Sequence, residues 1–246
     1  FEEFSRVQRP LRLDAFEHFI RGHSAVDDEL RVRELREAVR LEPNWPDPAF
    51  ALGQAAFARR DCSTAMVWFN RMPKSHHRFL EAVFATAVCR LWLNQPDRAE
   101  DAFRVLQELL GNCAAGGVPE ILNNLAIARE RNGKAAEAHS DLVRAAELDP
   151  EENDYPFNLG LLGLRGGDFA NAATGFREAI RRQPDDPEAR AALIYALERA
   201  GQKAEAQAER DSAAQIPGLL PLPAVKAENL GHLDRIKTQL DTTTLL

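Results

Sequence analysis

The sequence predicts an all-α protein that is built as a solenoid of stacked two-helix units. Gly133, Gly167 and Gly201 stand 34 residues apart. Other small and apolar residues keep the same interval, namely Leu125, Leu159 and Leu193 and then Ala138, Ala172 and Ala206. A helical pattern with this period is typical of helix pairs in which each pair buries its apolar face only against its neighbours.

The clearest unit covers residues 153–186. Its first helix is expected at about Asp154–Arg165 and its second at about Phe169–Arg182. Between them, Gly167 favours the left-handed backbone conformation that ends a helix. The next residue, Asp168, is of a type that caps the N-terminus of a helix, so we expect it to cap the second one.

Within and next to this unit, a set of residues resembles the tetratricopeptide repeat (TPR) family. The matching residues are Leu159-Gly160, Gly167, Ala172, Phe176, Ala179 and Pro184. The resemblance implies an α-solenoid of the TPR type, a right-handed superhelix of antiparallel helix pairs, with about six repeats. These repeats are expected at about 13–43, 46–78, 80–111, 119–152, 153–186 and 187–220. In the third of them, Asn94 stands in place of the turn glycine.

Segments outside the repeats complete the predicted organisation. Residues 1–12 are an N-terminal extension, 13–220 are the TPR solenoid, and 221–246 are a C-terminal capping helix and tail. Residues 224–240 are interpreted as one amphipathic helix over the last repeat, because their apolar residues recur at helical spacing. The alternative is that they bind a partner or fold back into the groove.

Composition excludes several classes of function. The chain has 246 residues, of which 45% are hydrophobic and 28% charged, and its net charge is −7. A protein that follows phosphates along a nucleic acid usually carries a basic surplus, so we expect no nucleic-acid partner. No run reaches the roughly 18 apolar residues of a membrane span, so we expect no membrane insertion.

No pattern of catalytic or metal-binding residues stands out. The cysteines are three in number and form no C-x-x-C pair, which favours buried thiols. His76 and His77 are adjacent and belong to no H-E-x-x-H motif. Gly133-Lys134 lacks the upstream glycine of a phosphate-binding loop. We therefore predict no catalytic residues, no cofactor and no metal site.

The resemblance also implies where a partner binds. In TPR proteins, the first helix of each pair lines the concave groove, and at Asn124 and Asn158 an asparagine can hold a peptide backbone. The same mapping places Asp154 and Glu188 in the groove. The predicted groove residues are Asn123, Asn124, Ile127, Arg131, Phe157, Asn158, Leu161, Leu164, Arg165, Tyr195 and Arg199, extended by Phe50, Phe57, Phe84 and Leu91.

Two features of this groove have competing explanations. Phe157, Leu161 and Leu164 share one helix face, and we hypothesise that they form an exposed apolar patch that anchors a peptide or a partner helix. Burial by superhelical curvature or by the C-terminal helix is the alternative. Arg131, Arg165 and Arg199 recur at the repeat interval and form a ladder of arginines. This ladder is explained either by an acidic ligand or by a local interaction with the helix dipole, and we favour the local interaction.

The function that these observations favour is a non-enzymatic scaffold that binds a protein or peptide of unknown identity in its concave groove. One alternative is a regulatory or substrate-recruiting domain of a larger enzyme or sensor. Another is a self-assembling module in which residues 224–240 of one chain enter the groove of a second. The first residue is Phe1 rather than Met, which favours a fragment or a processed product. The compartment therefore stays open between the cytoplasm and, after removal of an upstream signal, the periplasm or exterior.

Overall fold

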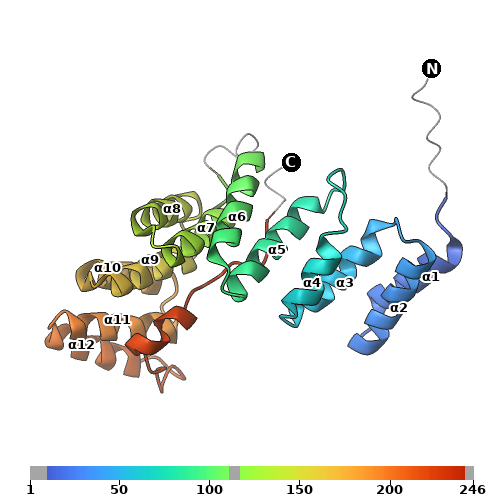
Figure 1. The fold of residues 1–246 in the computed structure, drawn as a ribbon. Coiled ribbons are helices and arrows are strands. Elements are labelled where there is room, and N and C mark those ends of the chain that lie inside the picture. Colours follow the sequence, from blue (N-terminus) through green and yellow to red (C-terminus); the bar gives the residue numbers. More distant parts are fainter. Residues whose placement is uncertain (1–9, 111–116, 242–246) are drawn as a thin grey trace. The chain divides into compact units, whose positions relative to one another are not determined.

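The computed structural model describes residues 10–110 and 117–241. In these residues the chain forms twelve α-helices and no β-strand, and consecutive helices of the same compact unit pack against each other (Figure 1). The chain divides into two compact units, residues 1–94 and 95–246. This division falls inside the predicted third repeat. None of the helices in the described ranges combines the length and the apolar character needed to cross a lipid bilayer.

The first unit contains five helices. They are α1 (Leu13–Ser24), α2 (Asp28–Leu41), α3 (Pro46–Ala58), α4 (Cys62–Phe69) and α5 (Phe79–Trp92). Aspartates begin two of them: Asp27 accepts a hydrogen bond from the amide of Leu30, and Asp61 accepts one from the amide of Thr64. Cys62 and Cys89 are free, buried thiols, as expected; Cys113 lies outside the described residues.

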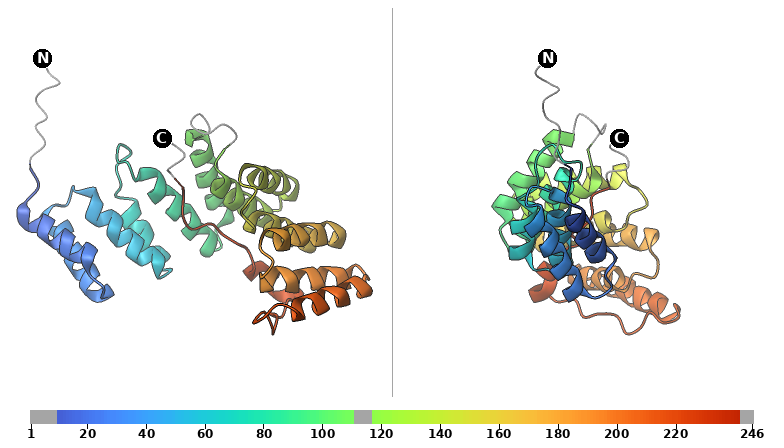
Figure 2. Two further views of the ribbon diagram at one scale, coloured as in Figure 1. Left: turned by 180° about the vertical axis from the view of Figure 1, so that it is seen from behind. Right: turned by 90° about the vertical axis from the view of Figure 1, so that its right-hand side faces the viewer.

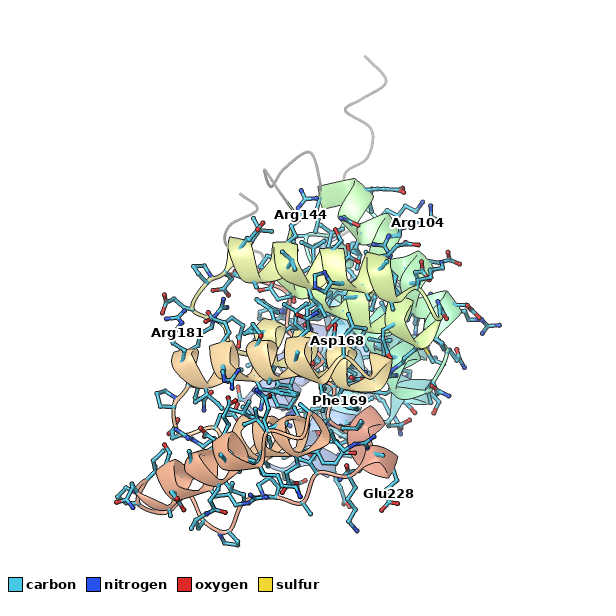
Figure 3. The ribbon with its side chains drawn as sticks, turned by 90° about the vertical axis from the view of Figure 1, so that its left-hand side faces the viewer. Arg104, Arg144, Asp168, Phe169, Arg181 and Glu228 are labelled. Carbon is cyan, nitrogen blue, oxygen red and sulfur yellow. The ribbon has the colours of Figure 1, made fainter. Side chains whose placement is uncertain are left out.

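The second unit contains seven α-helices, arranged as a single helix followed by three pairs. They are α6 (Pro96–Leu110), α7 (Pro119–Arg131), α8 (Ala135–Leu148), α9 (Asp154–Gly166), α10 (Phe169–Arg182), α11 (Pro187–Arg199) and α12 (Lys203–Ala214). Figure 3 shows the second helices of the pairs, α8, α10 and α12, lying one above another, with Asp168 and Phe169 at the start of α10. The predicted limits of α9 and α10 are confirmed to within one residue.

The turns inside the helix pairs use the predicted conformations. Gly167 has φ = 76°, and Asn94 has φ = 53°, so both lie in the left-handed region. Asp168 accepts a hydrogen bond from the amide of Asn171 at 3.1 Å and thereby caps α10. The repeat therefore fixes the turns between paired helices as well as the positions of the helices.

Close contact between α9 and α10 depends on Gly160. A methyl group at Gly160 would lie 2.6 Å from the Phe176 ring, and one at Gly175 would lie 2.6 Å from the Gly160 nitrogen. Ala172 lies against Gly163, where an added Cβ would be 2.8 Å from the Ala172 nitrogen. The helices of this pair can therefore approach only where these positions remain small.

The C-terminal part of the chain differs from the prediction. Residues 224–240 were expected to form one amphipathic capping helix, and this expectation is wrong. The structure has a short 3-10 helix, η2 (Ala227–His232), and then no regular secondary structure through residue 241. Contacts with other helices replace the internal hydrogen bonds of a helix in this stretch. We call residues 233–241 the C-terminal segment.

Candidate functional site

The C-terminal segment returns to the first helices of the three pairs in the second unit. Figure 2 shows it running as an extended trace past α11, α9 and α7, within the same unit. Its hydrogen bonds reach Asn123 and Asn124 on α7, Asn158 on α9 and Asp186 at the start of α11. The segment thus occupies the helix faces that the sequence assigned to the concave groove.

Two asparagines, one from each of two repeats, hold the main chain of the segment. The Asn158 side chain accepts from the amide of Arg235 at 3.0 Å and donates to the carbonyl of Arg235 at 3.0 Å. In the same way, the Asn124 side chain accepts from the amide of Lys237 at 2.9 Å and donates to the carbonyl of Lys237 at 2.8 Å. Each carboxamide therefore bonds both backbone groups of one residue, as a neighbouring β-strand does. Alternate residues of an extended chain face the same side, which suits this spacing.

A third asparagine joins these two into one buried network. Asn123 donates to the carbonyl of Arg235 at 2.9 Å and to the Asn124 side chain at 3.1 Å. Asn158 donates to the Asn123 side chain at 2.7 Å. All three amides are almost inaccessible to solvent. Buried amides need partners, and here the backbone of the segment supplies several of them.

The side chain of Asp234 is held by two arginines. Its carboxylate accepts from Arg131 on α7 at 2.8 Å and from Arg165 on α9 at 2.5 Å. Arg165 also donates to the carbonyl of Leu230 and pairs with Glu130. Only 4% of the Asp234 side chain is exposed, so solvent screens this pair of contacts weakly. Arg131 and Arg165 therefore hold an acidic side chain of the same chain, which the favoured helix-dipole explanation did not include. Binding of an acidic ligand from another molecule stays a prediction.

The guanidinium group of Arg235 lies among three carboxylates. It bonds Asp186 at 2.7 Å, Glu188 at 3.3 Å and Asp154 at 3.5 Å. Its centre also lies 3.6 Å from the centroid of the Phe157 ring, which is a close cation–π contact. Burial lowers the pKa of Arg235, but the hydrogen bond to Asp186 and the nearby charges outweigh it and raise that pKa. The arginine therefore stays charged.

Lys237 shares Asp154 with Arg235 and also pairs with Glu152. Its ammonium group lies 2.5 Å from Glu152 and 2.5 Å from Asp154, and it faces the Tyr155 ring. Burial lowers the pKa of Lys237, while the two carboxylates raise it by more. In return, Lys237 is the main cause that holds the pKa of Glu152 below its usual value, against the effect of burial. Asp154 thus bridges the two basic side chains of the segment.

One acidic group of α7 lacks such a partner. The Oε2 atom of Glu120 is buried without a hydrogen-bond partner, in the part of the chain that the structure describes. Burial raises the pKa of Glu120, and Asp241 and Asp149 add to this effect while Lys237 opposes it. The ionised form of Glu120 is therefore unfavourable in this fold.

The predicted apolar patch is not exposed. Phe157, Leu161 and Leu164 are buried in the core of the second unit, so the expectation of an exposed patch is wrong. Leu230 of η2 belongs to the same cluster, and Leu233 packs against it. The alternative, burial of these residues, is therefore correct, but the cause is only in part the expected one. The covering side chains come from η2 and the C-terminal segment rather than from a C-terminal α-helix, and from helix packing such as Phe157 on Phe176.

Other predicted groove residues lie elsewhere. Ile127 is buried in α7. Arg199 donates to the Tyr195 hydroxyl at 3.1 Å and lies over the Phe169 ring, away from the partners of Arg131 and Arg165. Tyr195 is half-buried. In the first unit, the predicted residues Phe50, Phe84 and Leu91 are buried, and Phe57 is partly buried against the core, so none of these four forms an open surface.

Sequence reasoning missed Glu152, Tyr155 and Asp186. These residues lie at the ends of repeats, where Asp186 also caps α11 by accepting from the amides of Glu188 and Ala189. Because the helix cap already explains an aspartate at this position, the position itself gives no sign that Asp186 also bonds Arg235. The one available signal is complementarity, because acidic residues gather at the beginnings of α9 and α11 and the segment supplies an arginine and a lysine.

A group of possible metal ligands occurs in the first unit. Asp47, His76 and His77 place ligand atoms within 4.8 Å of one another, although the two histidines are adjacent in sequence. The two histidines lie in the turn before α5, whereas Asp47 lies in the first turn of α3. Existing hydrogen bonds explain the arrangement: Trp45 donates to Asp47 at 2.6 Å, and the amide of Arg78 donates to His76. The prediction that the chain has no metal site stays a prediction.

Comparison with known families places the repeats. A family model described as tetratricopeptide repeat matches residues 123–176 and 164–219, which cover α8 to α12 and most of α7. Residues 123–219 carry tetratricopeptide repeats. A curated relative is Cellulose synthase operon protein C from Pseudomonas fluorescens (strain SBW25), which is 30% identical over 101 residues. The match spans 41% of this chain and 8% of that much longer protein.

Solved structures of similar fold include other TPR proteins. A TPR protein from Parabacteroides merdae ATCC 43184 aligns with a TM-score of 0.67 and 16% identity, over 88% of this chain and 82% of its own. MamA from Desulfovibrio magneticus RS-1 gives 0.64 and 20%, over 72% and 99%. YrrB, described as a TPR protein with an unusual peptide-binding site, gives 0.54 and 14%, over 76% and 92%. At these identities the likeness concerns the fold.

Proposed function

We propose that this chain is a non-enzymatic scaffold that binds a non-helical peptide segment of a partner protein. The binding surface is the set of side chains on α7, α9 and the start of α11 that contact the C-terminal segment, and we call it the segment site. The observation that carries the proposal is the pair of asparagine clamps on backbone groups.

Backbone recognition supports a peptide as the ligand. The clamps of Asn124 and Asn158 contact the amide and the carbonyl that almost every residue of a peptide offers, so they can hold chains of different sequence. This is the mode in which main-chain hydrogen bonds supply affinity and side-chain contacts supply specificity. The TPR fold is typically an interaction module, and one relative in structure, YrrB, is described as having a peptide-binding site.

A binding experiment tests this proposal on the full chain. Arg235→Ala weakens the hold of the C-terminal segment without changing the segment site, and a library of random displayed peptides is then selected on this variant. The selected peptides are expected to bind about 30-fold more weakly when Asn158→Ala is added. Two hydrogen bonds are lost, each worth about 1 kcal/mol net, and 1.4 kcal/mol is a factor of ten.

Asn171→Ala is the matched control. Asn171 lies on α10, where its amide donates only to Asp168 among the recorded contacts, and it does not touch the segment site. Peptide affinity is expected to be unchanged in this variant. Selection of no peptide, or equal affinity in the folded Asn158→Ala variant, would show that the segment site does not receive peptides from other proteins.

A second candidate is an interaction domain that serves an enzyme or another assembly as part of a longer protein. The match of 101 residues to a small part of Cellulose synthase operon protein C favours it. The segment site is the same in both candidates, and only the protein that presents it differs. Mass spectrometry of the endogenous chain, isolated with an antibody to residues 123–219, measures the length of the natural protein. A natural chain of about 27.4 kDa, the mass of these 246 residues, would exclude this candidate.

A further inference from the structure

Three charged side chains of the C-terminal segment lie against groups of opposite charge in the segment site. Asp234 lies between two arginines, Arg235 lies among three carboxylates, and Lys237 lies between two. The side chains of all three are largely shielded from solvent. The site is therefore complementary to an order of charges along a peptide, and not only to a peptide backbone.

Exchanging the first two charges would place like charges together. An arginine at the position of Asp234 would face Arg131 and Arg165, and an aspartate at the position of Arg235 would face Asp186 and its neighbouring carboxylates. Such juxtapositions discriminate strongly between partners, because repulsion acts against the wrong order while attraction favours the right one. The asparagine clamps alone cannot distinguish the two orders, since they contact only the backbone.

Apolar contacts fix where this charge pattern begins. Leu230 is buried in the core cluster of the second unit, and Leu233 packs against that cluster directly before Asp234. Between Arg235 and Lys237, the side chain of Ile236 is half-buried and uncharged, so it adds nothing to the charge pattern. Recognition is thus concentrated on a leucine, the aspartate, the arginine and, one residue further on, the lysine.

We infer that the segment site selects non-helical peptides with the sequence Leu-Asp-Arg-x-Lys, where x is the uncharged position that Ile236 occupies, and that Leu233–Lys237 is a resident copy of this ligand that partners must displace. This inference rests on the proposed function and names the chemistry of the partner. A ligand joined by a short flexible linker has an effective concentration on the order of millimolar. A free peptide that binds the vacated site at about 10 μM is therefore weakened about 100-fold by the resident segment.

The test uses three forms of the full chain: wild type, Arg235→Ala, and Lys237→Ala as a milder second release variant. The probe is a fluorescent synthetic peptide with the sequence of residues 229–241. A control peptide carries the two exchanges Asp234→Arg and Arg235→Asp, so that its composition and net charge are identical. Binding is measured by fluorescence anisotropy, and circular dichroism establishes that each variant is folded.

The peptide with the natural order is expected to bind both release variants at least 10-fold more tightly than wild type. The control peptide is expected to bind the release variants at least 100-fold more weakly than the natural peptide. Equal binding of the two peptides would overturn the sequence selectivity while leaving the proposed peptide function intact. Equal binding of the natural peptide to wild type and to both release variants would overturn its displacement of the resident segment.

Two further outcomes separate this inference from the proposed function. Failure of both peptides to bind folded release variants, while library peptides do bind, would reject Leu-Asp-Arg-x-Lys alone; failure of every peptide would reject the proposed function as well. A wild-type chain that light scattering shows to be a dimer, and that Arg235→Ala converts to a monomer, would instead assign the segment to the site of a second copy.

Discussion

Replacing Asp234 with asparagine removes the charge that Arg131 and Arg165 share, while the size of the side chain is unchanged. The buried carboxylate accepts one hydrogen bond from each arginine. A hydrogen bond to a charged group contributes about 1.5–3 kcal/mol, and a neutral one about 0.5–1.5 kcal/mol. The two arginines bond different oxygens of Asp234, and asparagine keeps one of these acceptors while its amide nitrogen faces the other arginine. One charge-assisted hydrogen bond is therefore lost, and we expect a total loss of about 2–3 kcal/mol for the bound state of the segment.

This loss is expected to appear as opening of the segment rather than as unfolding of the helices. A change of 2–3 kcal/mol raises the equilibrium constant for opening about 30- to 150-fold. Hydrogen exchange measured by NMR reports this opening at the amides of Arg235 and Lys237, which are bonded to Asn158 and Asn124. Neither amide is altered by Asp234→Asn, and far-UV circular dichroism is expected to be unchanged.

Asp211→Asn is the control for this measurement. Asp211 is exposed on α12, where its carboxylate accepts from Gln207, so the substitution makes the same chemical change away from the segment. We expect the exchange rates at Arg235 and Lys237 to stay at their wild-type values in this variant. Wild-type rates in folded Asp234→Asn would refute the reasoning, because the two arginine contacts would then contribute nothing to holding the segment.

Three further predictions concern the helices and the site. Gly160→Ala is expected to lower the free energy of unfolding by about 1–3 kcal/mol, because the added methyl group would crowd the Phe176 ring; urea denaturation measures this, and an unchanged midpoint would contradict it. Glu120→Gln is expected to stabilise the chain at pH 7 and much less near pH 4. Burial raises the pKa of Glu120, so its ionised form destabilises the fold only as the pH rises through that pKa; thermal melting at both pH values checks the sign, and an equal gain at both would count against it. Lys237→Met is expected to raise the pKa of Glu152, which NMR titration of that carboxylate measures, and a pKa that stays low would show that Lys237 is not its main support.

The repeat made the fold predictable because each turn between paired helices needs a residue with a left-handed φ. Gly133, Gly167 and Gly201 all take left-handed φ values, and Asn94 does so where glycine is absent. Such positions depend on the residues immediately around them, and therefore a sequence pattern can identify them. The limits of α9 and α10 follow for the same reason, from the turn between them and from the cap at Asp168.

The conformation of residues 224–240 was not predictable in this way. Leu230, Leu233 and Ile236 recur at helical spacing, which favoured a helix. Gly231 lies among them and lowers helix stability by about 1 kcal/mol relative to alanine. The decisive contacts, however, come from side chains such as Asn124, which is 113 positions from Lys237. Local periodicity carries no information about partners at that distance, and these tertiary contacts override it.

The roles of site residues were predictable only where the repeat itself fixes them. Asn124 and Asn158 were placed in the groove by their equivalent positions in successive repeats. The partner of Arg131 and Arg165 was not, because Asp234 lies 103 and 69 positions away from them. Asp186 was missed because helix capping fully accounts for an aspartate before Pro187. Complementary charges that are far apart in sequence can be identified as partners only when the path of the chain is known.

The hydrogen bonds of Asn124 and Asn158 to the backbone of residues 235 and 237 also affect the synthesis and the unfolding of the chain. Packing between helix pairs joins near neighbours in sequence, whereas the C-terminal segment contacts α7, α9 and the start of α11 together. Those three helices should therefore lose structure as one block rather than fray pair by pair. On the ribosome, α7, α9 and α11 emerge before residues 234–237 do, so a nascent chain passes through an interval in which the site is complete and its own ligand has yet to be synthesised.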